Sequence, residues 1–101
     1  MPLPIDFHWQ RAAATAHEKD VIAFEGVWWV VRLYQVHRGG PYLAVLDQHL
    51  SREQQITKPC SSHAQGRIGA ELWVERHQDR LRREIQQQRR LIALNQPPKV
   101  L

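Results

Sequence analysis

Apolar residues and turn signals alternate most clearly between Val27 and Leu46, in the run VWWVVRLYQVHRGGPYLAVL. β-Branched and aromatic residues dominate this run, and Arg38-Gly39-Gly40-Pro41 interrupts it once. The pattern is typical of a β-hairpin, because glycine accepts the backbone angles of a tight turn. A shorter apolar run, Val21–Phe24, precedes a second turn signal at Glu25-Gly26. We therefore predict a three-stranded antiparallel sheet over about residues 20–47.

Strict alternation sorts the side chains of the middle strand into two faces. One face would carry Val27, Trp29, Val31 and Leu33, and the other Trp28, Val30, Arg32, Tyr34 and Val36. Both sets are largely apolar, whereas a sheet with one side in water shows polar residues on that side. We therefore expect both faces to be covered, either by two helical segments or by one helix and a partner subunit.

The stretch from Ala70 to about Leu94 contains no glycine or proline and is rich in helix-forming residues. Ser62 and Gln65 upstream have the spacing of a helix capping box. Spacings of four and three trace one stripe along this helix: Val74, Gln78, Leu81, Ile85, Gln88 and Ile92. Two glutamines in the stripe argue against an isolated coiled coil. We predict a long helix over about residues 63–94 that lies partly on the sheet and partly projects. Gly66 and Gly69 weaken its first turns or allow close approach to the sheet.

The two ends of the chain are less regular. Residues 1–5, with two prolines, predict a flexible arm, and residues 95–101 a frayed tail. Asp6 is a suitable cap for a short helix from Phe7 to about His17, and a strand over Ile5–Trp9 is the alternative. Together these elements predict a single α+β domain over residues 1–101.

Composition narrows the class of protein. The chain has 101 residues, 43% of them hydrophobic and 24% charged, which is typical of one folded soluble domain. No basic leader with an apolar run and no apolar stretch of about 18 residues is present, so we expect no secretory signal and no membrane association. A single cysteine, Cys60, excludes an internal disulfide and fits a reducing cytoplasm.

The positive charge lies in the C-terminal part. Residues 1–66 contain six basic and six acidic side chains, so the net charge of +4 comes entirely from the residues that follow. Arg76, Arg80, Arg83 and Arg90 share one face of the predicted helix. Such a face favours contact with phosphates or with an acidic protein surface. The alternative is an ordinary solvated face, with Asp79 paired to Arg83.

The predicted sheet offers a second contact surface. Trp28, Arg32 and Tyr34 on one face, beside Arg38 in the turn, would form a stacking surface for single-stranded nucleic acid. Packing or dimerisation explains the same apolar face more simply, and we expect a homodimer. A helix-turn-helix made of Ser51–Lys58 and the stretch from Ser62 onward is a third arrangement, with little support from the apolar spacing.

The sequence gives only weak support for a metal site or a catalytic site. Cys60 and His63 have the spacing of zinc ligands, and Asp47 with His49, or His37, could complete a site. Because there is no second cysteine, we assign no metal. The same two residues as nucleophile and base lack an oxyanion site and an orienting group, so we assign no catalytic residue and no cofactor.

The sequence therefore predicts a small, basic, non-enzymatic binding protein. The first hypothesis is association with nucleic acid through the arginine-rich C-terminal helix. The alternative is a protein-protein interaction module, an adaptor or an inhibitor of a larger complex, that uses the apolar sheet face or the long helix.

Overall fold

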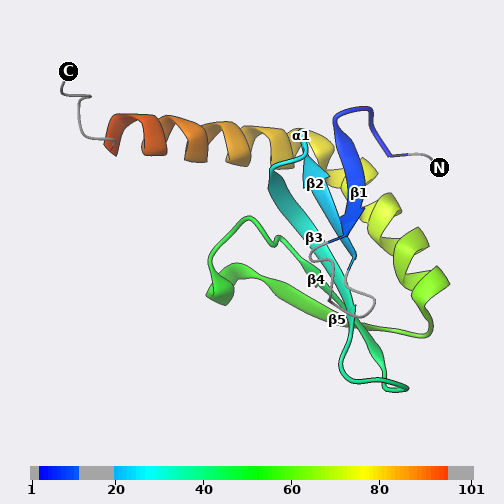
Figure 1. Ribbon diagram of the computed structural model, residues 1–101. Coiled ribbons are helices and arrows are strands. Elements are labelled where there is room, and N and C mark those ends of the chain that lie inside the picture. The colour runs from blue at the N-terminus through cyan, green and yellow to red at the C-terminus, as the bar shows by residue number, and fades with distance from the viewer. Residues whose placement is uncertain (1–2, 12–19, 96–101) are drawn as a thin grey trace.

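The computed structural model describes residues 3–11 and 20–95 (Figure 1). Five strands form one antiparallel sheet in sequence order: β1 (Phe7–Arg11), β2 (Asp20–Phe24), β3 (Trp28–Gln35), β4 (Tyr42–Leu46) and β5 (Ile56–Cys60). A short 3-10 helix, η1 (Arg52–Gln54), lies between β4 and β5, and the helix α1 (His63–Asn95) follows β5. The α+β class and the long C-terminal helix are confirmed, but the sheet has five strands instead of three.

The predicted N-terminal helix is wrong. Its first residues form β1, in which Phe7 lies opposite Phe24 and Trp9 opposite Ile22. Phe7 is buried and Trp9 packs against the core, while His8 between them is exposed. This two-residue period is that of a strand. The rest of the predicted helix, residues 12–17, and the tail 96–101 lie outside the described residues.

The turn between β2 and β3 forms where the sequence predicts it. Glu25 and Gly26 have positive φ angles of 52° and 74°, and the Val27 amide donates a hydrogen bond to the Phe24 carbonyl oxygen. Two consecutive positive φ angles give the turn whose twist matches that of the neighbouring strands.

A β-bulge in β3 changes which side chains face the core. Ile22 lies opposite Val31, but Ala23 lies opposite Trp29, so Val30 is an extra residue in its strand. Val30 and Val31 both belong to the buried core, and Trp28 packs against it. Trp29, on the opposite face, is 36% exposed. The predicted division of β3 into two faces is therefore wrong before Val31.

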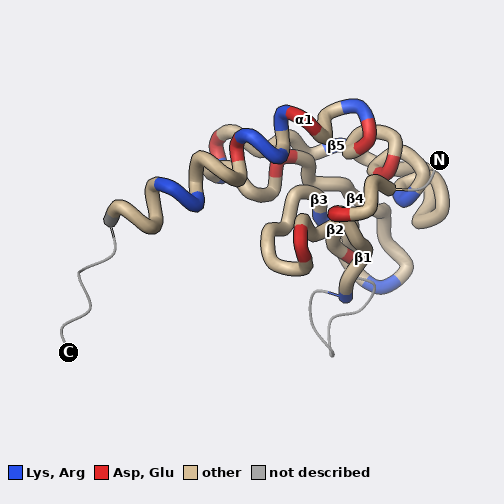
Figure 2. The backbone as a smooth tube through the Cα atoms, turned by 90° about the horizontal axis from the view of Figure 1, so that it is seen from above, with Lys and Arg blue, Asp and Glu red and all other residues tan. Residues whose placement is uncertain are grey.

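One face of the sheet is covered by α1 (Figure 1). Val74, Leu81 and Ile85 on this helix are buried in the same core as Ile22 and Val31. Gln78 and Gln88 are half-buried, and Ile92 at the end of the predicted stripe is exposed. At 33 residues the helix is about 50 Å long, longer than the sheet that it covers. Its C-terminal end projects beyond the sheet, as predicted (Figure 2).

The opposite face has no helix over it among the described residues. Val21, Ala23 and Val45 on this face are buried, and the Arg32 guanidinium lies 4.8 Å from the centre of the Tyr34 ring. Of the two predicted arrangements, the one with two covering helices is absent from the described part of the chain. The arrangement with a partner subunit stays a prediction.

Hydrogen bonds at the start of α1 follow the sequence signal. The Gln65 amide donates to Ser62 Oγ at 3.1 Å, which satisfies one of the free amides of the first turn. Gly66 lies against Leu33 and Cys60, so this glycine does allow close approach, whereas Gly69 faces open space.

No helix in the described residues has an apolar stretch long enough to span a membrane.

Candidate functional site

Three arginines form an outward-facing row on α1, which we call the arginine face: Arg76, Arg83 and Arg90. All three are exposed, and in the described residues none has a carboxylate within ion-pair distance. The intervals of seven residues place successive side chains about 10 Å apart on nearly the same side of the helix. Gln86 and Gln87 border a shallow depression between Arg83 and Arg90. Basic residues, blue in Figure 2, follow α1 toward its projecting end.

Arg80, the fourth predicted contact residue, is engaged within the molecule. Its Nη1 lies 3.0 Å from Asp47 Oδ1 and 2.9 Å from Glu84 Oε1. The predicted ion pair between Asp79 and Arg83 does not form. Asp79 Oδ1 lies 3.4 Å from Arg82 Nη1 instead. Arg83 is therefore left exposed, whereas Arg80 helps to fix α1 to the sheet side.

The remaining ion pairs of α1 tie it to the sheet and its turns. Arg82 contacts Asp6, Arg89 contacts Glu25, and Arg67 and His63 both contact Asp20. The hydrogen bonds from Arg82 hold the pKa of Asp6 below its usual value, and Asp6 in turn raises the pKa of Arg82. The helix thus separates its arginines into a set paired with carboxylates and the arginine face.

The four residues of the predicted stacking surface do not lie together on one face of the sheet. Trp28 lies on the α1 side, with the Arg89 guanidinium 5.8 Å from its ring centre. Arg32 and Tyr34 stack on each other on the opposite face, and Arg38 is exposed in the turn after β3. The bulge at Val30 is the cause, because it moves Trp28 to the other side of the sheet.

Cys60 and His63 have different hydrogen-bond partners, and Cys60 Sγ lies 3.9 Å from the Lys58 carbonyl oxygen. His63 Nε2 lies 2.9 Å from Asp20 Oδ2, and the His63 ring packs against Tyr42. Burial raises the pKa of the Cys60 thiol, the opposite of what an activated nucleophile needs. The predicted helix-turn-helix is wrong as well, since Ser51–Lys58 contains η1 and most of β5.

A groove that sequence reasoning missed lies between the β4–β5 hairpin and the first half of α1. Its volume is about 460 Å³. Apolar side chains such as Leu46, Leu72 and Trp73 line it, together with the exposed cations Lys58 and Arg76. The sequence of β5 is too polar to predict a strand. The side of the groove that β5 forms could therefore not be predicted.

Comparison of the chain with models of known families, with curated proteins and with solved structures gave no match.

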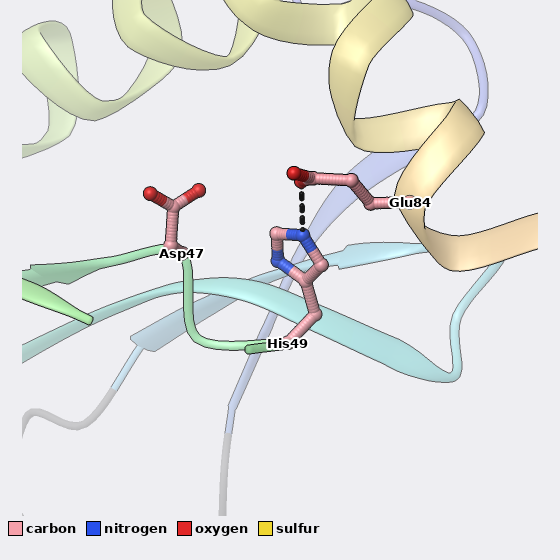
Figure 3. A group of neighbouring side chains, drawn as sticks. All are labelled: Asp47, His49 and Glu84. Carbon is pink, nitrogen blue, oxygen red and sulfur yellow. Dashed lines mark hydrogen bonds and ion pairs between the residues drawn. The ribbon is translucent and has the colours of Figure 1, made fainter. Parts of the chain in front are cut away.

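A cluster of acidic and imidazole groups lies where the chain leaves β4. Asp47 follows β4 directly, His49 lies two residues further on, and Glu84 comes from α1 (Figure 3). His49 Nε2 lies 2.8 Å from Glu84 Oε1. The sequence pointed to Asp47 and His49 as completing ligands for Cys60 and His63. The partner that the structure brings to them is Glu84, from a helix that the chain reaches much later.

Proposed function

We propose that this chain is a small, basic, non-enzymatic protein that associates with nucleic acid through the arginine face. The observation that supports the proposal is the exposure of Arg76, Arg83 and Arg90 without a carboxylate partner in the described residues. A cation already paired with a carboxylate must lose that pair to bind a phosphate. The exposed arginines carry no such cost, so they are the contacts that a polyanion would meet first.

The geometry favours the phosphate backbone over base edges. The arginine face lies along one helix, with the amide groups of Gln86 and Gln87 as additional hydrogen-bond donors. Phosphate contacts position a protein on nucleic acid but carry no sequence information. We therefore expect binding that depends strongly on salt and weakly on sequence.

Fluorescence anisotropy with a labelled mixed-sequence DNA duplex tests the proposal. Three phosphate contacts predict a loss of affinity of about 40-fold between 50 and 200 mM salt. The double variant Arg83→Glu with Arg90→Glu should bind at least about tenfold more weakly at 50 mM salt. The matched control, Arg38→Glu with Arg52→Glu, changes two exposed arginines away from α1 and should bind like the wild type. Absence of binding at 50 mM salt, or equal losses in the two variants, would refute the proposal.

A second candidate function is contact with an acidic, amphipathic protein segment in the groove. Leu72 in the groove lining is an exposed apolar residue, and Lys58 and Arg76 add positive charge to the lining. A labelled peptide of alternating Leu and Glu is a suitable probe. This candidate predicts binding by the wild type, loss of binding in Leu72→Asp, and retained binding in the Arg83→Glu, Arg90→Glu variant.

A further inference from the structure

The strongest unassigned feature is the cluster of Asp47, His49 and Glu84. One potential ligand atom from each residue lies within 4.8 Å of the others. The cluster joins the loop after β4 to the middle of α1, and Figure 3 shows His49 and Glu84 directed at each other with the Asp47 side chain beside them. An imidazole with two carboxylates is a ligand set that proteins use for zinc and related transition metals.

Burial of the cluster provides a second, independent observation. The His49 side chain is 0% exposed and that of Asp47 is 8% exposed. His49 Nδ1 is buried and has no hydrogen-bond partner in the described residues. Figure 3 shows this nitrogen on the side of the ring that faces Asp47. Buried polar atoms almost always have partners, so an imidazole nitrogen left unpartnered beside a buried carboxylate points to a missing one.

Two carboxylates and one guanidinium lie together in the cluster. Asp47 and Glu84 carry two negative charges, and Arg80 contributes one positive charge near both carboxylates. Arg80 Nη1 is 3.0 Å from Asp47 Oδ1, yet this contact is not aligned as a hydrogen bond, and Asp47 Oδ1 remains without one. A divalent cation would neutralise both carboxylates.

We infer that Asp47, His49 and Glu84 bind a divalent transition-metal ion, with Zn²⁺ the best match to this ligand set. The ion takes the position between the carboxylates that the Arg80 guanidinium holds, and Arg80 turns outward. Zinc distances of about 2.0–2.2 Å require the ligand atoms to move closer together. Glu84, whose side chain is 29% exposed and lies on the helix surface, has the freedom to make most of this movement. Water can supply the fourth ligand from the same exposed side.

Titration of the 101-residue chain with ZnCl₂ against a chromophoric chelator tests the inference. We expect one zinc ion per chain. Glu84→Gln and His49→Gln should each weaken binding by at least about tenfold. Arg80→Gln, which removes the competing cation, should tighten it. Cys60→Ser and His63→Gln are the controls, because they remove the zinc ligands that sequence spacing suggests, and both should bind zinc like the wild type.

Two results would overturn the inference: no stoichiometric zinc binding by the wild type, or Glu84→Gln binding as tightly as the wild type. If His49→Gln fails to fold because its side chain is buried, Glu84→Gln decides the question, since Glu84 is partly exposed. Addition of zinc should also raise the Tm of the wild type and of Arg80→Gln, and leave that of Glu84→Gln nearly unchanged.

Discussion

Arg82 donates two hydrogen bonds to Asp6, from Nε to Oδ2 at 2.7 Å and from Nη2 to Oδ1 at 2.8 Å. Asp6 stands just before β1, and its carbonyl oxygen also accepts a hydrogen bond from the Glu25 amide. One residue thus joins the first strand, the β2–β3 turn and the long helix. Paired hydrogen bonds between a guanidinium and a carboxylate are among the stronger polar contacts in proteins.

Replacement of Asp6 by Asn should reduce stability in a pH-dependent way. The Arg82 hydrogen bonds lower the folded-state pKa of Asp6, so its contribution is complete above the ordinary aspartate pKa and is lost as the pH falls through the lower folded value. We expect Asp6→Asn to reduce the free energy of unfolding by about 1 kcal/mol at pH 7. Urea denaturation should show the difference from wild type shrinking below about pH 4. A difference that does not change with pH would contradict this assignment.

The two glycines at the start of α1 should respond oppositely to alanine. A Cβ at Gly69 meets nothing within 4 Å, so Gly69→Ala should raise the free energy of unfolding by up to about 1 kcal/mol through helix propensity. A Cβ at Gly66 would lie 2.8 Å from Leu33 Cδ1 and 3.2 Å from Cys60 Sγ. Because Leu33 is fully buried, this clash should cancel the same gain or reverse it. Thermal unfolding of both variants measures the contrast, and equal stabilisation would show that the helix lies further from the sheet.

Arg80 and Arg83 should differ in their effect on stability, although the sequence places them on one face. Arg80→Ala removes the cation beside the buried Asp47 carboxylate and should cost about 1–3 kcal/mol. Arg83→Ala removes an exposed side chain and should change stability by less than about 0.5 kcal/mol. Chemical denaturation in metal-free buffer gives both values. Similar losses in the two variants would mean that Arg80 is not held as the structure shows.

The sequence predicts the centre of the fold better than its edges. The hairpin turns and the helix carry strong local signals, and the helix observed over His63–Asn95 nearly matches the predicted 63–94. β5 was missed because Ile56–Cys60 contains Lys58 and Pro59 and has no buried apolar alternation, as is common for an edge strand. The bulge at Val30 was missed because one inserted residue reverses every face assignment before it, and alternation in the sequence does not reveal it.

The candidate sites depended on contacts that sequence spacing does not contain. Helical periodicity placed Arg76, Arg80, Arg83 and Arg90 together. The carboxylate that holds Arg80 comes from the end of β4, and only the packing of α1 on the sheet brings it there. The partner of His49 is likewise on α1. Local patterns therefore identified which residue types matter, and tertiary packing decided which of them remain available.

The end of α1 has a further consequence for how the arginine face works. Arg89 is the last residue of α1 with an ion pair to the sheet side in the described part of the chain, and the side chains from Arg90 to Leu94 are all exposed. Backbone hydrogen bonds alone hold a helix poorly at its end, so amide exchange should be rapid around Arg90 and slow around Leu81. Arg76 lies on the part of the helix that packs against the sheet, so a polyanion can bind there without ordering the helix first. Contact at Arg90 must first order the last turns of the helix. Association should therefore begin near the sheet and spread outward along the helix.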